Sequence, residues 1–491
     1  MKQSLYQPIR QQFIRQVVLA GTVCCFLSGC KATATDETST GQQASAQANT
    51  EMARPKPPSG QAATTTHANA AHTILKKFDF GAGAVQAGYQ QVLPSTKYSS
   101  ERGYGIISKS PVQAINREGA DALRSDFITS NAPFYFAVDL PEGNYEVTLL
   151  LGDLQGTSTT TVKAESRRLM LEKVETPAGK VESHTFTVNV RTPRINEVES
   201  IRLKSRELGY LNWDNKLTLE FNNSRPCVAA IEIRETPDVI SMYLAGNSTV
   251  VDQEYEPWAA WGQMIPRFFK PGVVVTNYAE SGESLKAFVG ERRLEKILSV
   301  IKPNDYLFIE FAHNDQKPGS SHVEPFTTYK DMLKHYISEA RKRGAIPVLV
   351  TSMHRRNFDE QGKIVNTLGD YPEAVRQTAK EENVAVIDLN AMSKEFYEAM
   401  GPEKSKKAFV HFPSGTFPGQ EKELKDDTHF SAYGAYQLAR GIVEGIKKNN
   451  LKLADYLRDD VKPFDPANPD PVDNWQLPQS PDVTAVKPDG S

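Results

Sequence analysis

Four short segments of the chain contain the side chains with the most evident chemistry. Their sequences are Gly-Asn-Ser-Thr-Val at 246–250, Glu-Ser-Gly-Glu-Ser at 280–284, Ala-His-Asn-Asp at 312–315 and Asp-Asp-Thr-His at 426–429. A serine hydroxyl such as that of Ser248 is a poor nucleophile near neutral pH unless a base takes its proton. The imidazole of His429 could be that base. The pair therefore indicates acyl transfer through a covalent serine intermediate.

A base of this kind must be oriented by a third group, which is usually a carboxylate. Asp426 precedes His429 by three residues and could turn back to hold its second ring nitrogen. We therefore assign the orienting role to Asp426. Asp427 is one residue nearer, and we expect it to be solvated or to cap the following helix, although spacing alone does not exclude it.

Acyl transfer also needs hydrogen-bond donors where the tetrahedral oxyanion forms, and losing one donor costs about 2.7 to 4 kcal/mol. The candidates are the backbone N–H groups of Ser248 and Gly282 and the side-chain amide of Asn314. Each segment alone is also typical of a turn or a helix start. The prediction rests on all of them following strands of one sheet.

The elements that must position these residues alternate between strands and helices after Pro237. We expect strands at 239–245, 273–278, 306–311, 346–352 and 384–389, and helices at 258–269, 284–301, 327–343, 371–382 and 431–448. Such alternation predicts right-handed crossovers and a three-layer α/β/α fold with a parallel sheet. Ligands bind such sheets at the carboxyl ends of the strands, where the four segments lie.

Three basic side chains follow the fourth predicted strand and would lie at the same rim. They are His354, Arg355 and Arg356. Arginine forks suit carboxylates, so these residues are candidates for substrate binding. An exposed basic loop with no ligand explains the same residues equally well.

Residues 74–235 contain repeated short runs of β-forming residues with turn residues between them, which predicts a β-sandwich. The runs 134–140 and 145–151 flank a Pro and Gly turn and predict a hairpin. Several aromatic side chains could stack on sugar rings or could simply be buried. They are Tyr89, Tyr98, Tyr104, Tyr210 and Trp213.

The first 29 residues have the pattern of an export signal. Lys2, Arg10 and Arg15 precede the apolar run 17–27, which ends in Leu-Ser-Gly-Cys at 27–30. This pattern resembles a bacterial lipoprotein signal, which implies lipidation at Cys30 and attachment to a membrane, with the outer membrane preferred. A plain signal peptide is the alternative. In either case the protein is expected in the periplasm or at the cell surface.

The remaining organisation follows from composition. Residues 30–73 have almost no large apolar side chains and predict a disordered linker after Cys30. The β-sandwich then spans 74–235, the α/β domain 236–450, and a Pro- and Asp-rich tail 451–491. A net charge of -3 gives no support for nucleic-acid binding. Metal-ligand spacing of His or Cys is absent, so we expect no metal and no other cofactor.

The four segments, in this order, resemble the conserved blocks of the GDSL or SGNH hydrolase superfamily. The resemblance is strongest to rhamnogalacturonan acetylesterases, also through Trp-Gly-Gln-Met-Ile-Pro at 261–266 and Asn-Tyr-Ala at 277–279. It implies a flavodoxin-like fold, a triad of Ser248, His429 and Asp426, oxyanion donors from Ser248, Gly282 and Asn314, and no metal. Two residues depart from the family pattern, because Asn247 replaces the usual Asp and Ala312 the usual Gly.

The segments Phe-Asp-Phe-Gly at 78–81, Gly-Tyr at 88–89 and Gly-Tyr-Gly at 103–105 resemble the jelly-roll, galactose-binding-like domains that precede some carbohydrate esterases. Together the resemblances imply an esterase that removes acetyl groups from a plant cell-wall polysaccharide, rhamnogalacturonan first. Deacetylation of another glycan such as xylan is the alternative. An inactive, glycan-binding surface lipoprotein is the alternative from another class. The sequence does not determine the oligomeric state.

Overall fold

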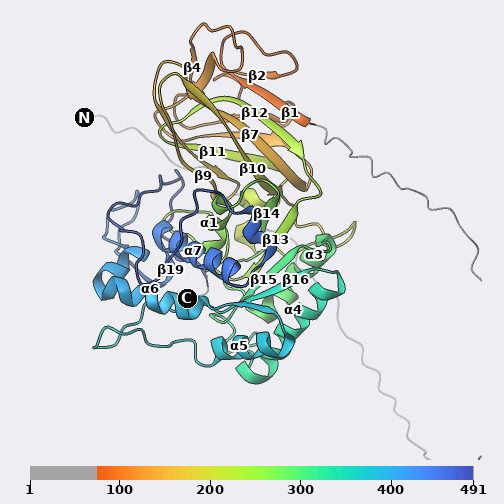
Figure 1. Cartoon of the computed structure of the whole chain (residues 1–491), viewed down its shortest axis with the longest axis vertical. Coiled ribbons are helices and arrows are strands. Elements are labelled where there is room, and N and C mark those ends of the chain that lie inside the picture. The colour runs from red at the N-terminus through yellow and green to blue at the C-terminus, as the bar shows by residue number, and fades with distance from the viewer. Residues whose placement is uncertain (1–73, 490–491) are drawn as a thin grey trace, which may run out of the picture. The chain divides into compact units, whose positions relative to one another are not determined.

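The computed structural model describes residues 74–489, and all of these belong to one compact unit (Figure 1). The predicted signal peptide, the lipidation site at Cys30 and the linker lie outside the described residues. None of the helices in the described part is long and apolar enough to cross a bilayer.

Residues 74–235 form two antiparallel sheets that face one another. One has the strand order β10-β7-β12-β1-β2 with β4 and β5 attached through β12, and the other has the order β3-β6-β11-β8-β9. Side chains from both sheets, including Phe78, Phe136, Val147 and Leu219, form one buried apolar core. The predicted β-sandwich is therefore confirmed. Its strands are β1 Ile74–Phe80, β2 Gln90–Val92, β3 Tyr104–Ile107, β4 Gln113–Asn116, β5 Asp126–Thr129, β6 Phe134–Asp139, β7 Gly143–Asp153, β8 Ser158–Ala164, β9 Arg168–Thr176, β10 Lys180–Val190, β11 Lys216–Arg225 and β12 Cys227–Glu235.

The predicted hairpin between β6 and β7 is wrong. β6 pairs with β3 and β11, whereas β7 pairs with β10 and β12 in the opposite sheet. The segment around Pro141 is therefore a corner between the sheets, and the hydroxyl of Tyr145 donates to the Pro141 carbonyl at 2.8 Å. The alternating pattern of a strand does not specify which neighbour it pairs with, so the sequence could not distinguish the two connections.

The second part contains a parallel sheet of five strands in the order β14-β13-β15-β16-β17. The strands are β13 Ile240–Gly246, β14 Val273–Asn277, β15 Tyr306–Glu310, β16 Ile346–Val350 and β17 Ala385–Ile387. The predicted flavodoxin-like α/β fold is confirmed. Every residue of β14 and β15 is buried, as expected of parallel strands covered on both faces.

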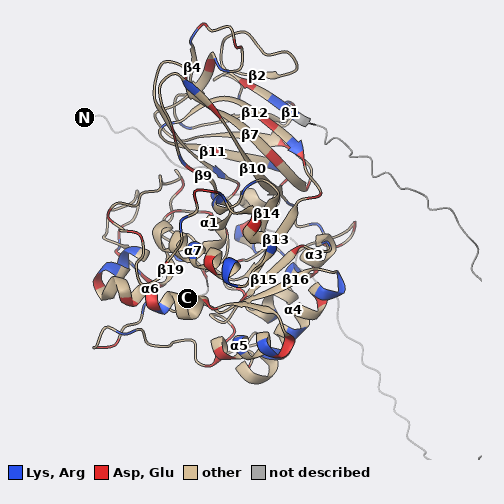
Figure 2. Cartoon of the chain, in the orientation of Figure 1, with Lys and Arg blue, Asp and Glu red and all other residues tan. Residues whose placement is uncertain are grey.

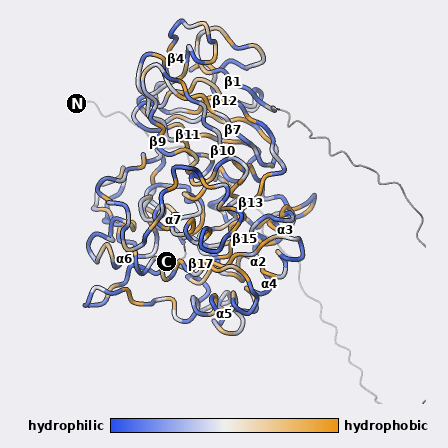
Figure 3. The backbone as a smooth tube through the Cα atoms, in the orientation of Figure 1, coloured by the Kyte–Doolittle hydropathy of each residue, from blue (hydrophilic) through white to orange (hydrophobic). Residues whose placement is uncertain are grey.

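Helices cover both faces of this sheet. The helices are α1 Trp261–Met264, α2 Leu285–Gly290, α3 Arg293–Val300, α4 Lys330–Lys342, α5 Tyr371–Glu382, α6 Leu389–Lys404 and α7 Ala432–Lys448. Met242, Leu244 and Phe308 pack with α1, α6 and α7, and the alternate residues Tyr243, Leu307 and Ile309 pack with α2 to α5. Figure 3 shows the hydropathy along these strands, and Figure 2 shows acidic and basic residues mixed along the outer helices.

Three predicted helices differ from the structure. The first is only the short α1 followed by a 3-10 turn, Ile265–Phe268. The second is divided into α2 and α3 by Arg292, whose φ is +65°. The third begins with a π-helical turn, Pro325–Tyr329. The sequence pattern did not predict α6. This helix begins after Asp388, whose side chain accepts a hydrogen bond from the Ala391 N–H.

Residues 426–429 do not follow a strand of the parallel sheet, as expected, but lie on a strand of a separate two-stranded sheet. β19, Leu424–Phe430, pairs antiparallel with β18, Phe409–Phe412. The register shifts sharply, because Phe409 is opposite Phe430 while the next residue, Val410, is opposite Asp426. Residues 427–429 therefore bulge out of the ladder, immediately before α7.

The C-terminal segment 451–489 has no strand, and its only helix is a short 3-10 turn, Lys452–Tyr456. It contacts both parts of the protein. The Lys163 ammonium of the β-sandwich donates to the Pro478 carbonyl at 2.7 Å and to the Ser480 hydroxyl at 2.8 Å, and Trp475 packs against Tyr433 and Tyr436 of α7.

Candidate active site

Ser248 lies just after the carboxyl end of β13, where the chain turns sharply. A Cβ added to Gly246 would lie 2.6 Å from the Val250 side chain and 3.2 Å from the Glu310 carbonyl, so the turn has no room for a side chain there. The Asn247 side-chain oxygen accepts hydrogen bonds from the N–H and hydroxyl of Thr249 at 3.0 and 2.8 Å. These contacts fix the turn that presents Ser248.

A continuous chain of hydrogen bonds links Ser248 to His429 and Asp426. The Ser248 Oγ lies 2.9 Å from His429 Nε2, and His429 Nδ1 lies 2.7 Å from Asp426 Oδ2. All three side chains are buried, with Ser248 only 1% exposed. This geometry allows the imidazole to take the serine proton while the carboxylate holds its other nitrogen.

The bulge in β19 brings Asp426 and His429 to the same side of the strand. Because residues 427–429 leave the ladder, the N–H groups of Thr428 and His429 instead donate to Asp426 Oδ1 at 2.9 and 3.0 Å. Trp258 Nε1 donates to Asp426 Oδ2 at 3.3 Å. Burial alone would raise the pKa of Asp426, but these hydrogen bonds and the His429 charge hold it well below the usual value.

Asp427 does not face His429. Of the two roles expected for it, solvent exposure agrees with the structure, because its side chain is 41% exposed, and capping of the following helix does not. Its carboxylate pairs with Arg356 Nε at 2.5 Å and with His411 Nε2 at 2.8 Å. The cap of α7 is Ser431, whose hydroxyl accepts from the Gly434 N–H. The geometry therefore favours Asp426 as the partner of His429.

The predicted oxyanion donors come from loops that are tied together. The Asn314 amide donates to the Glu283 carbonyl at 2.9 Å, and the Asp315 carboxylate accepts from the Leu285 N–H at 2.8 Å. Gly282 has a φ of +86°, which L side chains rarely adopt. Gly282 and Asn314 line one hollow of about 420 Å³.

The two departures from the family pattern have visible consequences. Asn247 keeps the hydrogen bonds of the turn, but within residues 74–489 its buried amide nitrogen has no hydrogen-bond partner. Ala312 adopts a φ of +155°, a value that favours glycine. The backbone before Asn314 is therefore held in a strained conformation.

The three rim residues have different environments. The His354 backbone N–H donates to the Ser393 hydroxyl, and burial lowers the pKa of its side chain to about 4. Arg356 is neutralised by Asp427. Arg355 donates to Thr367 and to the His313 carbonyl, all uncharged oxygens. Of the three predicted substrate-binding residues, only Arg355 therefore remains a candidate for binding a carboxylate.

Sequence reasoning missed two basic residues from the β-sandwich part. Lys204 immediately precedes the 3-10 turn Ser205–Gly209, and Arg206 lies in it. Both side chains donate to the Ser281 carbonyl at 2.7 Å. Their ion-pair partners, Glu283 and Glu280, are buried on either side of Gly282, and burial raises the pKa of each carboxyl to about 7. No motif in the sequence links residues 204–206 to residues 280–283.

The aromatic residues of the β-sandwich part contact protein groups. The hydroxyls of Tyr89 and Tyr98 bond Glu232 and Asp139, Tyr104 packs on Phe78, and Trp213 Nε1 donates to Glu207. Tyr210 differs, because it lines a hollow of about 310 Å³ with Arg206, Trp258 and Ser281.

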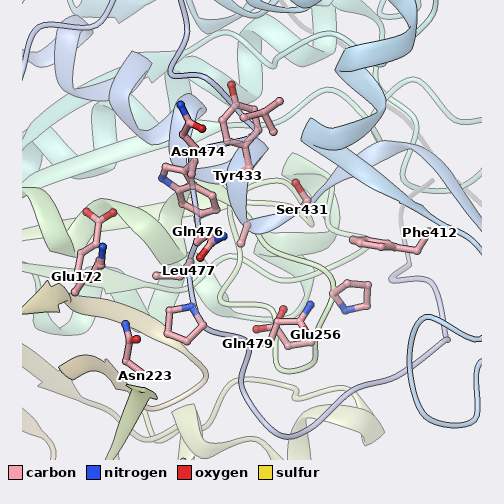
Figure 4. Close-up of a pocket in the computed structure, with 16 residues that line it drawn as sticks. Glu172, Asn223, Glu256, Phe412, Ser431, Tyr433, Asn474, Gln476, Leu477 and Gln479 are labelled. Atoms are coloured by element: carbon pink, nitrogen blue, oxygen red, sulfur yellow. The ribbon is translucent and has the colours of Figure 1, made fainter. Parts of the chain in front are cut away.

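A larger hollow of about 650 Å³ lies elsewhere. Figure 4 shows it between Glu172 and Asn223 of the β-sandwich part, Phe412 and Tyr433 of the α/β part, and residues 474–479 of the C-terminal segment. Its lining includes none of the triad or oxyanion residues. Gly282 and Asn314 line the hollow of about 420 Å³, and Trp258, which bonds Asp426, lines the hollow of about 310 Å³, so we place the candidate active site at these smaller hollows. The described residues contain no cluster of three or more side chains arranged to hold a metal ion.

Comparison with known proteins assigns both parts of the chain. Residues 76–196 match the family described as beta-agarase/YXIM esterase-like, galactose-binding domain-like, and residues 244–436 match the GDSL-like lipase/acylhydrolase family. The fold and these matches define a carboxylic ester hydrolase with an N-terminal galactose-binding-like domain. The chain belongs to the GDSL-like lipase/acylhydrolase family.

Individual relatives are similar to one or both parts of the chain. Rhamnogalacturonan acetylesterase RhgT of Bacillus subtilis is 46% identical over 220 residues, which are 44% of this chain and 94% of the relative. The uncharacterized esterase YxiM of the same organism is 28% identical over 397 residues, 78% of this chain and 93% of the relative. The crystal structure of YxiM aligns with 77% of this chain and 99% of that protein, at 26% identity and a TM-score of 0.41.

Proposed function

We propose that this esterase removes O-acetyl groups from rhamnogalacturonan. The observation that carries the proposal is the hydrogen-bonded chain from Ser248 through His429 to Asp426, in a domain that is 46% identical to a rhamnogalacturonan acetylesterase. The proposed catalytic residues are these three, and the proposed oxyanion donors are the N–H groups of Ser248 and Gly282 and the amide of Asn314.

The reaction proceeds in two steps. Ser248 Oγ attacks the acetyl carbonyl carbon while His429 Nε2 takes its proton, and the carbonyl oxygen becomes an oxyanion held by the three donors. The carbon–oxygen bond to the sugar then breaks, and His429 gives its proton to the departing sugar hydroxyl. Water attacks the acetyl-serine with His429 again as base, which releases acetate and restores Ser248.

Acetate release from acetylated rhamnogalacturonan and from acetylated xylan tests the substrate, with both polysaccharides at equal acetyl concentration. We expect a higher kcat/KM on rhamnogalacturonan. A higher kcat/KM on acetylated xylan would instead favour a neutral glycan as the substrate, with the same catalytic residues.

Ser248→Ala tests the chemistry. Activity on every acetyl ester, including an aryl acetate, is expected to fall by at least about a thousandfold. Ser299→Ala, an exposed serine on α3, is the matched control and should retain full activity. An unaffected Ser248→Ala protein would favour a glycan-binding protein without esterase activity.

We also propose that Cys30 carries a lipid that attaches the exported protein to a bacterial membrane. The support is the Leu-Ser-Gly-Cys sequence after a short apolar run. Metabolic labelling with a radioactive fatty acid should mark the natural chain and not the Cys30→Ser variant. Equal labelling of both proteins would reject the proposal.

A further inference from the structure

Basic side chains from both domains gather at the mouth of the predicted oxyanion hole. Lys204 and Arg206 come from the galactose-binding-like domain, and Lys317 and Arg355 follow β15 and β16. Lys204 and Lys317 line one hollow with Gly282 and Asn314, and Arg206 lines the neighbouring hollow with Ser281. We call these four residues the basic cluster.

Arg206 is oriented by its contacts before any ligand arrives. Its Nε and Nη2 donate to the buried Glu280 carboxylate at 3.1 and 2.8 Å, and Nη2 also donates to the Ser281 carbonyl. These bonds occupy one edge of the guanidinium. The remaining nitrogen, Nη1, faces the mouth and pairs there with Asp489. A guanidinium held in place in this way loses little entropy when its free nitrogen binds a carboxylate.

Lys204 lies beside the oxyanion donor itself. Its ammonium pairs with Glu283, and it lies 3.6 Å from the position that a Cβ on Gly282 would take. Lys204 and Arg206 therefore flank the Ser281–Gly282 segment.

Lys317 and Arg355 lack the close acidic partners that Lys204 and Arg206 have. Within residues 74–489 neither side chain makes an ion pair, and the Lys317 ammonium makes no hydrogen bond. Burial lowers the pKa of Lys317, the nearby charge of Arg355 acts in the same direction, and the Asp489 carboxylate offsets only part of this effect. Partly buried cations without a counter-charge are costly, so the cluster favours an anionic ligand.

A carboxylate already occupies this place. Asp489 of the C-terminal segment pairs with Arg206, lines both hollows, and has its Cβ 3.2 Å from the position of a Cβ on Gly282. The segment also reaches the triad, because the Lys487 ammonium lies 3.3 Å from Asp426 Oδ1. Asp489 therefore lies directly beside Gly282 in the hollow.

We propose that the basic cluster binds the carboxylate of a uronic acid unit in the acetylated glycan, and that Asp489 occupies this subsite when substrate is absent. The inference rests on the proposed acetylesterase function and deepens it. A uronate supplies a single planar carboxylate beside sugar hydroxyls, and its oxygens can accept from Nη1 of Arg206 and from the ammonium of Lys317. A neutral glycan supplies no group for these charges. The galactose-binding-like domain thereby contributes to substrate specificity within the active site.

The test compares kcat/KM on acetylated galacturonan oligosaccharides and on acetylated xylan oligosaccharides. In Arg206→Gln we expect the ratio of the acidic to the neutral substrate to fall at least tenfold relative to the natural enzyme. Lys317→Gln should lower the same ratio and does not disturb the ion pair with Glu280. Asp489→Asn should lower KM for the acidic substrate, since it removes the competing carboxylate.

Arg292→Gln is the matched control. Its guanidinium is 32% exposed, against 33% for Arg206, and it also joins the two domains, through Glu199 at 2.7 Å. The ratio should be unchanged in this variant. An unchanged ratio in both Arg206→Gln and Lys317→Gln would overturn the subsite while leaving the esterase proposal intact. Full activity of the Ser248→Ala variant would instead contradict the esterase proposal itself.

Discussion

Asp426 and Asp427 are neighbours in the chain, yet only Asp426 contacts His429. The difference arises from the bulge in β19, which turns the N–H groups of Thr428 and His429 onto Asp426 Oδ1. With Oδ1 held in this way, Oδ2 is left to bond the imidazole. The carboxylate therefore selects the tautomer of His429 that can accept the serine proton at Nε2.

Asp426→Asn should lower kcat by about 10⁴-fold with little change in KM, because an amide can stabilise the wrong imidazole tautomer and cannot stabilise its charge. Asp427→Asn is the control, since this carboxylate pairs with Arg356 and His411 instead. Steady-state kinetics on an aryl acetate measure both. An equal loss in the two variants would contradict the assignment of Asp426.

At the scale of the element, β15 links the core of the sheet to the turn after β13. Its last residue, Glu310, is buried and accepts from Trp261 Nε1 at 2.6 Å, from the Thr249 hydroxyl at 3.0 Å and from the Ser352 hydroxyl at 3.4 Å. Burial raises the pKa of Glu310 to about 7 despite these hydrogen bonds. One carboxyl thus connects three segments around the site.

This raised pKa makes Glu310 a source of pH-dependent stability. Between about pH 4.5 and 7 the unfolded chain has released the Glu310 proton and the folded protein still holds it, so the free energy of unfolding falls as pH rises. The full effect is on the order of 3 kcal/mol. Glu310→Gln removes it, because Gln cannot ionise.

Denaturant unfolding of both proteins at pH 4.5 and pH 8 measures this effect. The stability of Glu310→Gln relative to the natural protein should improve by roughly 3 kcal/mol between the two pH values. A relative stability that does not change with pH would show that Glu310 titrates near its ordinary value.

At the scale of the whole molecule, buried and partly buried ion pairs connect the galactose-binding-like domain to α3 and to the loop that carries Gly282. Glu207 pairs with Arg293 at 2.5 Å, and both side chains are 0% exposed. Lys204 and Arg206, on either side of Ser205, neutralise Glu283 and Glu280. The accessory domain is therefore part of the electrostatic support of the site.

Glu207→Gln should destabilise the protein by about 3 kcal/mol, because it leaves the Arg293 charge buried with only Glu291 to balance it. Glu199→Gln removes the partner of Arg292 from an exposed pair and should cost less than about 1 kcal/mol. Thermal and denaturant unfolding compare the two variants. If both variants lost the same free energy of unfolding, burial of the Glu207–Arg293 pair would not increase its contribution to stability.

The sequence by itself determined the strands of the parallel sheet and the segments that meet at its edge. Five apolar runs between helical segments predict this sheet, because the hydrophobic pattern of a strand is local. Ser248, His429 and Asp426 are predicted from residue type and position, and the structure places them in one hydrogen-bonded chain.

Only the tertiary structure decided which partners each charged side chain has. The bulge that separates Asp426 from Asp427, the corner between β6 and β7, and the pairing of Arg356 with Asp427 all depend on segments far apart in the chain. Lys204 and Arg206 reach the active site for the same reason. Neutralisation of a buried charge depends on distance in space, and no local pattern in the sequence records that distance.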